Sequence, residues 1–386
     1  MSAAAAEALA RFAKRRATEL GFDAVGITDA VPSEHGALLE RWLAEGRHGA
    51  MDYLARPDAV ERRKDPRRSF EAARSVIVVA HDYGTGGEQN EDPDRGIIAR
   101  YARGRDYHKV VKGRLKALLR ELDVEAERLG VADGVAGRAY VDTGPLLERE
   151  LGRRAGLGWF GRNTMLIDPK RGSYFVLGAL LVDVALPADP PFEADRCGSC
   201  RACLDACPTG ALLGRDADGA PVMDANRCIS YLTIELRGPI PEELRAPLGN
   251  RVFGCDICQE VCPWNGGFAV AAGDPAYAAR GPGERPHGVE ALPDGTAVPH
   301  PGTDSPPLVE LMRMTREEWE AFSRGSSIRR AGYEGFKRNV AVALGNGLTG
   351  LEGAPPAEAV AVLREALEDE SELVQEAARG ALARTR

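Results

Sequence analysis

The chain has 386 residues, of which 44% are hydrophobic and 28% charged, and its formal net charge is −8. This composition predicts a globular protein of two or three compact units, and the acidic balance argues against a uniform nucleic-acid coat while leaving room for a local basic patch. No run approaches the roughly 18 consecutive apolar residues of a membrane span, and the charged N-terminal segment does not fit a secretory signal. We therefore expect a cytoplasmic protein without membrane contact.

The first half of the chain alternates strand and helix patterns. The apolar, β-branched runs FDAVGITDA (22–30) and SVIVVAHDY (75–83) predict strands. HKVVKGRLKALLRELDVEAERL (108–129) predicts a long amphipathic helix, and SYFVLGALLVDVAL (173–186) predicts a buried strand or strand pair. Residues 1–186 are therefore expected to form an α/β or α+β domain.

Three further segments follow. Residues 187–267 hold all eight cysteines and many Gly, Pro and Asp residues, a composition that suits loops around an inorganic group. Residues 268–307 are rich in Gly and Pro and lack periodicity, which predicts a linker. Residues 308–386 are expected to be helical, and GFKRNVAVAL matches LVQEAARGAL at an offset of 38 residues, close to the period of HEAT-like helix pairs. An ordinary pair of alanine-rich helices is the alternative.

The cysteine spacing carries the strongest chemical signal. The run from Cys197 to Pro208 reads C-x2-C-x2-C-x3-C-P, the bacterial ferredoxin pattern in which three thiolates hold one cluster and the fourth ligates its neighbour. A second set begins with Cys228 and resumes after an insertion. Two zinc sites are the alternative, but paired C-x3-C-P closures favour two 4Fe-4S clusters. The crossed pairing predicts one cluster on Cys197, Cys200, Cys203 and Cys262, and the other on Cys207, Cys228, Cys255 and Cys258.

Two other motifs match a known pattern only in part. GLGWFG (156–161) has the glycines of a dinucleotide site, but a helical run precedes it and a loop follows, whereas that site needs a strand before and a helix after. DYHKVV (106–111) begins like the stretch that supplies histidine to the lower face of cobalamin, but Val111 replaces its glycine. We expect neither a nicotinamide site nor a histidine ligand to cobalt.

The stretches RYARGRDYHKV, YVDTGPLLERELGRRAGLGWFGRNTMLI, CGSCRACLDACPTGAL and GNRVFGCDICQEVCPWN together resemble the epoxyqueuosine reductase family over nearly the whole chain. The resemblance implies a cobalamin-dependent iron–sulfur enzyme, related to reductive dehalogenases, that reduces epoxyqueuosine to queuosine at the wobble position of a tRNA anticodon. It also implies a cobalamin-binding α/β domain, a ferredoxin-like domain with two 4Fe-4S clusters and a HEAT-like tail.

The resemblance also implies site residues. It places the proton donor on Asp142 in AYVDTGPLLE, for which a helix N-cap is the alternative. Because a general acid must hold its proton at neutral pH, we expect burial to raise the pKa of Asp142. Each polar cobalamin contact has an ordinary buried hydrogen-bond partner as its alternative. The contacts implied are Arg63, Asp106, Asp142, Asn163, Leu166, Leu177, Ser230 and Asp256.

The segment FSRGSSIRRAGYEGFKRN (322–339) is the candidate RNA contact. Five basic residues stand there against Glu334 alone, and such a patch can neutralise phosphates of the anticodon stem, although a solvated helix face is the alternative. The five residues are Arg324, Arg329, Arg330, Lys337 and Arg338. A splayed anticodon base also favours aromatic stacking, for which Trp159, Phe160 and Trp264 are candidates.

Two competing functions fit parts of the sequence. One is a dehalogenase-like cobalamin reductase that acts on a small molecule, and the other is an iron–sulfur electron carrier without substrate chemistry. The enzyme hypothesis predicts a monomer that binds tRNA and receives electrons from a ferredoxin or flavodoxin type of donor.

Overall fold

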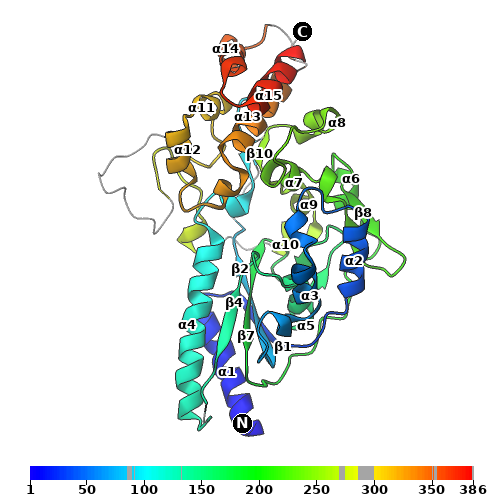
Figure 1. Cartoon of the computed structure of the whole chain (residues 1–386), viewed down its shortest axis with the longest axis vertical. Helices are drawn as coiled ribbons and strands as arrows, with labels where there is room; N and C mark the ends of the chain where they lie inside the picture. The colour runs from blue at the N-terminus through cyan, green and yellow to red at the C-terminus, as the bar shows by residue number, and fades with distance from the viewer. Residues whose placement is uncertain are drawn as a thin grey trace.

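The computed structural model describes residues 1–84, 89–90, 92–131, 133–268, 274–285, 300–349, 351 and 354–384. A four-stranded sheet lies in its lower half as Figure 1 is drawn. All three strand pairings in this sheet are antiparallel, so the first domain is of the α+β class rather than a parallel α/β sheet. The strand order is β1 (Ala24–Asp29), β2 (Ser75–Asp82), β7 (Phe175–Val182) and β4 (Gly137–Tyr140).

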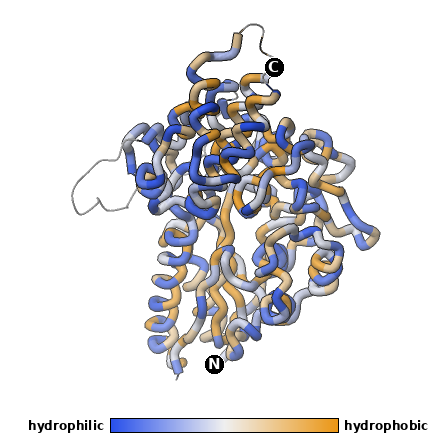
Figure 2. Tube along the Cα trace, turned by 45° about the horizontal axis from the view of Figure 1, so that its top comes forward, coloured by the Kyte–Doolittle hydropathy of each residue, from blue (hydrophilic) through white to orange (hydrophobic). Residues whose placement is uncertain are grey.

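Helices cover both faces of this sheet. Ile77 and Val79 of β2 join the core beneath α1 (Ala3–Glu19) and α4 (Tyr107–Arg128), which lie side by side in Figure 1. The intervening side chains of β2 face α5 (Glu148–Arg154) on the other side. Every residue of β2 is buried, as expected for a strand covered on both faces, and hydrophobic residues run along the central strands in Figure 2.

Short elements surround this domain. The loop at 156–161 leads from α5 into a strand and not from a strand into a helix, which confirms that it is not a dinucleotide fingerprint. The remaining elements of this part are α2 (Gly36–Ala44), α3 (Pro57–Lys64), the antiparallel pair β5 (Trp159–Phe160) and β6 (Leu166–Ile167), α6 (Ala202–Ala206), the antiparallel pair β8 (Leu212–Arg215) and β9 (Pro221–Met223), α9 (Ile257–Glu260) and α10 (Pro263–Phe268).

The insertion between Cys228 and Cys255 is a structural unit rather than a loose loop. It forms α7 (Ile229–Ile234), α8 (Glu242–Arg245) and β10 (Arg251–Phe253), and β10 pairs in parallel with β3 (Ile97–Ile98). Its apolar side chains share one hydrophobic cluster with the tail. The tail therefore packs against the insertion.

The tail is helical, as expected. The two similar stretches fall on helices that contact each other, α13 and α15. The tail helices are α11 (Leu308–Arg313), α12 (Arg316–Ser323), α13 (Tyr333–Leu348), α14 (Ala357–Glu365) and α15 (Glu372–Ala383).

The predicted linker lies partly outside the described residues, at 269–273 and 286–299. Where the structure describes it, the segment is anchored: Tyr277 is fully buried in the core with α4, and the Asp274 carboxylate forms an ion pair with Arg114 of that helix. Across the described ranges, no helix has the length and apolar character needed to cross a membrane.

Candidate active site

Asp142 lies between the end of β4 and the start of α5, in a strained backbone conformation. Its φ is +53°, and that of Thr164, on the β5–β6 turn, is +64°. Left-handed φ values are uncommon for residues other than glycine, and such residues cluster at functional sites. Both residues line the same cavity.

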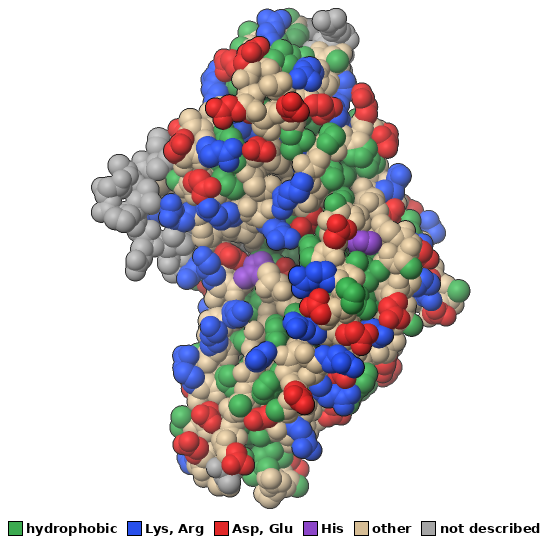
Figure 3. Space-filling model, in the orientation of Figure 1, with side chains coloured by type: hydrophobic (Ala, Val, Ile, Leu, Met, Phe, Trp, Pro, Cys, Tyr) green, Lys and Arg blue, Asp and Glu red, His purple; other side chains and the backbone are tan. Residues whose placement is uncertain are grey.

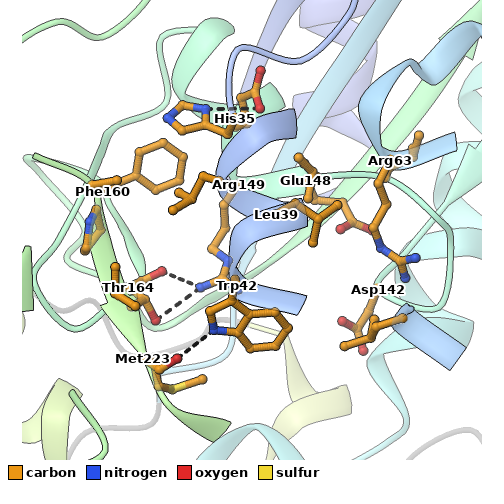
Figure 4. A pocket seen from close by; sticks show the side chains of 18 of the residues that line it. His35, Leu39, Trp42, Arg63, Asp142, Glu148, Arg149, Phe160, Thr164 and Met223 are labelled. Atoms are coloured by element: carbon orange, nitrogen blue, oxygen red, sulfur yellow. Dashed lines mark hydrogen bonds and ion pairs between the residues drawn. The ribbon is translucent and has the colours of Figure 1, made fainter. Parts of the chain in front are cut away.

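This cavity has a volume of about 340 Å³ and a mixed lining. In Figure 4, Phe160 and His35 lie at one end, Trp42 in the middle, and Arg63 near Asp142 at the other end. The wall is fixed by hydrogen bonds: the Trp42 indole donates to the Met223 carbonyl oxygen at 2.7 Å, and the Arg149 guanidinium donates to the Thr164 carbonyl oxygen. Aromatic rings and positively charged side chains thus line the same cavity.

The carboxylate of Asp142 accepts two hydrogen bonds on one oxygen. The Tyr107 hydroxyl lies 2.8 Å from Oδ2, and Nε2 of His108 lies 3.2 Å from it. The surrounding protein disfavours the charged carboxylate, but the hydrogen bonds from His108 and Tyr107 outweigh this and lower the pKa of Asp142. The expected rise in its pKa is therefore wrong. The side chain is 65% exposed, so a substrate can reach it.

Glu148 is a second carboxyl group in this cavity, and sequence reasoning missed it. It is the first residue of α5, it lines the cavity, and within the described parts of the chain its buried Oε1 has no hydrogen-bond partner. Burial and the nearby charge of Asp142 raise the pKa of Glu148 to about 8. A glutamate in the first turn of a helix is common, so nothing in the sequence marked this one as neutral.

Of the residues implied as cobalamin contacts, Arg63 and Asp142 line the cavity. Leu166 and Leu177 belong to the core beneath α5, and Asp106 caps the N-terminus of α4. The other six, outside this lining, are Asp106, Asn163, Leu166, Leu177, Ser230 and Asp256.

Three of these six residues lie beside cysteines. The Asn163 amide donates to the Cys258 carbonyl oxygen at 3.2 Å. Ser230 hydrogen-bonds to Cys228, and Asp256, which is 2% exposed, accepts the backbone N–H of Arg100 at 2.8 Å. The contacts of Asn163 and Asp256 therefore connect the cavity domain with the cysteine segment.

The first predicted cysteine group converges on a small cavity of about 50 Å³. Burial raises the pKa of Cys203 to about 11, and the neighbouring thiols that add to this rise are Cys197, Cys262 and Cys200. These are the four cysteines that the crossed pairing assigns to one cluster.

The cysteines of the second group are all half-buried. Burial raises the pKa of the Cys258 thiol, with further contributions from Cys255 and Cys228, and Cys228 in turn lies near Cys207. All eight cysteines are free thiols. Soft thiolates in two groups of four are the donor set that iron–sulfur clusters require, so the residues present fit two such clusters.

The aromatic candidates have different surroundings. Trp159 is 2% exposed, packs edge-on against Trp264 with ring centroids 5.0 Å apart, and clusters with Cys262. Its burial excludes stacking on an RNA base. Phe160, by contrast, lines the cavity of Asp142.

Two of the five basic residues in the tail are buried, and the prediction that they contact RNA is wrong. Arg338 is 1% exposed, and its guanidinium donates to the carbonyl oxygens of Leu232 and Gly238, each at 2.6 Å. Lys337 is 8% exposed and forms an ion pair with Asp369 at 2.8 Å. Both hold α13 in place.

The other three basic residues, Arg324, Arg329 and Arg330, are exposed. Arg329 forms an ion pair with Glu320 of α12, and Arg330 forms one with Glu235 at 2.8 Å. Arg330 also lies over the ring of Tyr53, at 5.5 Å from its centroid. Figure 3 shows Lys and Arg side chains along the hollow between the tail and the sheet domain.

Comparison with known proteins assigns the family. The family model described as "Epoxyqueuosine reductase QueG, DUF1730" matches residues 63–143, and the one described as "4Fe-4S double cluster binding domain" matches residues 196–265. The epoxyqueuosine reductase of Pseudomonas aeruginosa is 43% identical over 342 residues, which cover 88% of this chain and 85% of the relative. That of Escherichia coli is 40% identical over 342 residues, or 88% and 81% of the two chains.

Solved structures agree with this assignment. A crystal structure of epoxyqueuosine reductase with an epoxyqueuosine-modified stem loop of tyrosine tRNA matches with a TM-score of 0.78 and 28% identity, covering 98% of this chain and 90% of that one. The enzyme of Streptococcus thermophilus matches with a TM-score of 0.77 and 26% identity, covering 97% and 90%. The chain belongs to the epoxyqueuosine reductase family.

Proposed function

We propose that the chain carries out its family's reaction, the two-electron reduction of epoxyqueuosine to queuosine at the wobble position of a tRNA anticodon, in the cavity where Asp142 lies. The observation that carries this proposal is Asp142 itself: a reachable carboxylate, held at a strained backbone position in the wall of a cavity. Family membership sets aside the two competing functions, a small-molecule dehalogenase and a pure electron carrier.

Two cofactor types complete the enzyme. The cysteine groups hold two 4Fe-4S clusters, and the family is cobalamin-dependent. A corrinoid presents an apolar ring, carboxamide arms and a phosphate. The cavity offers Trp42 and Phe160 to the ring, and Arg63 and Arg149 to the phosphate. Oε1 of Glu148, which has no hydrogen-bond partner among the described residues, is available to a carboxamide arm. When bound, cobalamin supplies a low-valent cobalt that is a strong nucleophile or electron donor. The chain's own part is to place the nucleoside and to move protons at the Asp142 carboxyl.

The tail is proposed to grip the anticodon stem. Arg324, Arg329 and Arg330 are the exposed cations of the basic segment, and Arg330 contacts Tyr53. Tyr53 in turn is close enough to Asp142 to be affected by its charge. Phosphate contacts on this segment would therefore bring a splayed wobble nucleoside toward the cavity. We also propose that α13 to α15 form a HEAT-like repeat.

The remaining features of the proposed enzyme follow from this substrate and chemistry. We propose a cytoplasmic monomer that receives single electrons from a ferredoxin or flavodoxin. The proposed units are a cobalamin domain at 1–186, a two-cluster domain at 187–267, a connecting segment at 268–307 and the tail at 308–386.

Asp142→Asn tests the proposal. We expect this variant to retain both clusters and cobalamin but to lose turnover by about 10² to 10⁴-fold, the usual contribution of one acid. Anaerobic assays would follow queuosine formation in epoxyqueuosine-bearing tRNA, with iron content and the cobalamin spectrum measured in parallel. Asp58→Asn, an exposed carboxylate at the start of α3, is the matched control. Full turnover in Asp142→Asn would refute the assignment.

A further inference from the structure

The reaction consumes protons that Asp142 does not hold at rest. Loss of the epoxide oxygen as water takes two electrons and two protons. The pKa of Asp142 is lowered by its hydrogen bonds, so its carboxyl group is ionised at neutral pH. A neighbouring group must therefore protonate Asp142 before it can act as an acid.

We propose, resting on the function proposed above, that His108 supplies this proton to Asp142, and that Asp106 holds the histidine ring in place for the transfer. His108 is then a positioning and proton-feeding residue behind Asp142, and not a ligand to a metal. The cofactor and cluster chemistry of the proposed reaction gives His108 no other role.

The geometry of the three residues forms a continuous path. Nδ1 of His108 lies 2.7 Å from Oδ1 of Asp106, and Nε2 lies 3.2 Å from Oδ2 of Asp142. Both ring nitrogens thus face carboxylates, an arrangement that the doubly protonated ring satisfies, because both of its nitrogens are donors. Within the described ranges Oδ1 of Asp142 has no hydrogen-bond partner, which leaves it available to substrate.

The ring is held in this orientation by its neighbours on α4. Asp106 caps the helix by accepting the backbone N–H of His108 at 3.0 Å. Tyr107 stacks on the imidazole, with centroids 4.0 Å apart and an interplanar angle of 25°, and its hydroxyl donates to the same oxygen of Asp142. Cap, stacking partner and acceptor together fix the direction of Nε2.

Electrostatics favour a charged ring. Partial burial disfavours the imidazolium, but hydrogen bonds to Asp106 and Asp142 outweigh it and raise the pKa of His108 to about 9. Other titratable groups also face this chain of residues. Lys109 acts on Asp106, and the groups that interact with Asp142 include the Tyr107 hydroxyl, Arg149, Glu148, Arg63, Tyr53 and Tyr101. The imidazole is 27% exposed, so water can reprotonate it after each transfer.

The proposed step balances in protons and electrons. The imidazolium gives its Nε2 proton to Oδ2 of Asp142 and becomes neutral imidazole. Rotation of the carboxyl group about its Cβ–Cγ bond then brings this proton to the substrate side, where the acid protonates the epoxide oxygen as the first carbon–oxygen bond breaks. A ferredoxin or flavodoxin supplies the two electrons through the clusters. The oxygen leaves as water after a second proton, which the refilled His108–Asp142 pair also delivers.

His108→Gln tests the relay, because glutamine keeps a hydrogen-bonding side chain but cannot carry the proton. We expect kcat to fall by roughly 10²-fold, with KM for tRNA and cluster content unchanged. His108→Ala should regain part of its rate when imidazole is added, which a purely structural role would not predict. Lys116→Ala, exposed on the same helix, is the control. Wild-type kcat in His108→Gln would overturn the relay.

The pH dependence of kcat is a second test of the relay. As pH rises through the pKa of His108, the imidazolium disappears, so kcat of the wild type should fall above about pH 9. Asp106→Asn removes one partner that raises this pKa and should move the fall to lower pH.

A titration by NMR of the His108 ring in the protein that carries its oxidised clusters, without tRNA, gives a readout independent of turnover. A ring that titrates near the ordinary histidine value of about 6.5 would overturn the proposal. Activity in His108→Gln together with inactivity in Asp142→Asn would refute the relay alone, and activity in both would also refute the assignment of Asp142 as the acid. Absence of queuosine formation in the wild type would refute the proposed function itself.

Discussion

The cysteine segment and the basic segment of the tail differ in how well the sequence predicts where their side chains lie in the fold. The four cysteines that the crossed pairing assigns to one cluster line one small cavity, and Cys258 lies near Cys255 and Cys228 of the other predicted group. Of five basic residues within 322–339, three are exposed and two are buried. A cluster ligand can be satisfied only near other thiolates, so cysteine spacing constrains geometry. An arginine carries both a charge and a rigid fork of five donors, and either can be the reason for its presence.

The buried arginine uses its donors. Arg338 satisfies carbonyl oxygens at the C-terminal end of α7, including that of Leu232, which lies 106 residues earlier in the chain. Asn339 beside it donates to the carbonyl oxygens of Thr233 and Val252. The exposed C=O groups of a helix end need such partners. Part of the basic segment therefore serves to hold the tail against the insertion in the cysteine segment by hydrogen bonds.

The largest effect should come from breaking the crossed cysteine pairing. We expect Cys262→Ser and Cys197→Ser to lose the same cluster, and Cys207→Ser to lose the other, because the crossing places Cys262 with the first three cysteines. Each variant should fall from about eight to about four iron atoms per chain and lose turnover. Iron and sulfide analysis with paramagnetic resonance of the reduced protein would measure this, and Ser199→Ala is the control.

If Cys262→Ser removed the same paramagnetic signal as Cys258→Ser, and not the signal that Cys197→Ser removes, the cysteines would be assigned to the two clusters in sequence order instead. In that case, the spacing of the cysteines would predict which residues share a cluster no better than the basic residue type predicts which side chains are exposed.

The next effect should separate the two kinds of arginine. Arg338→Met keeps the volume of the side chain but leaves buried carbonyl oxygens without donors, so we expect the free energy of unfolding to fall by about 3 kcal/mol. Arg330→Met removes an exposed ion pair and should change it by at most about 1 kcal/mol. Urea denaturation of both variants makes the comparison. Equal stability in the two would show that burial of Arg338 does not matter to the fold.

The sequence predicts the features that depend on residues near one another in the chain, and it does not predict those that depend on contacts between distant segments. The strands at β1, β2 and β7 and the helix α4 follow from local apolar periodicity. The buried state of Glu148 does not, because it depends on a cavity wall assembled from α2, α3 and β9. The lowered pKa of Asp142 likewise depends on Tyr107 and His108, which come from another helix.

The smallest effect should come from charge reversal at the exposed arginines. Arg329→Glu combined with Arg330→Glu should weaken tRNA binding about tenfold and reduce the dependence of log Kd on log salt by about 2, one for each phosphate that is no longer neutralised. The effect is modest because Glu320 and Glu235 already neutralise part of this charge. Salt-dependent binding to an anticodon stem loop would measure it, with Arg11→Glu and Arg15→Glu on α1 as the matched pair. An unchanged salt dependence would show that these arginines, like Arg338, serve the fold, and the RNA contact would have to lie elsewhere on the chain.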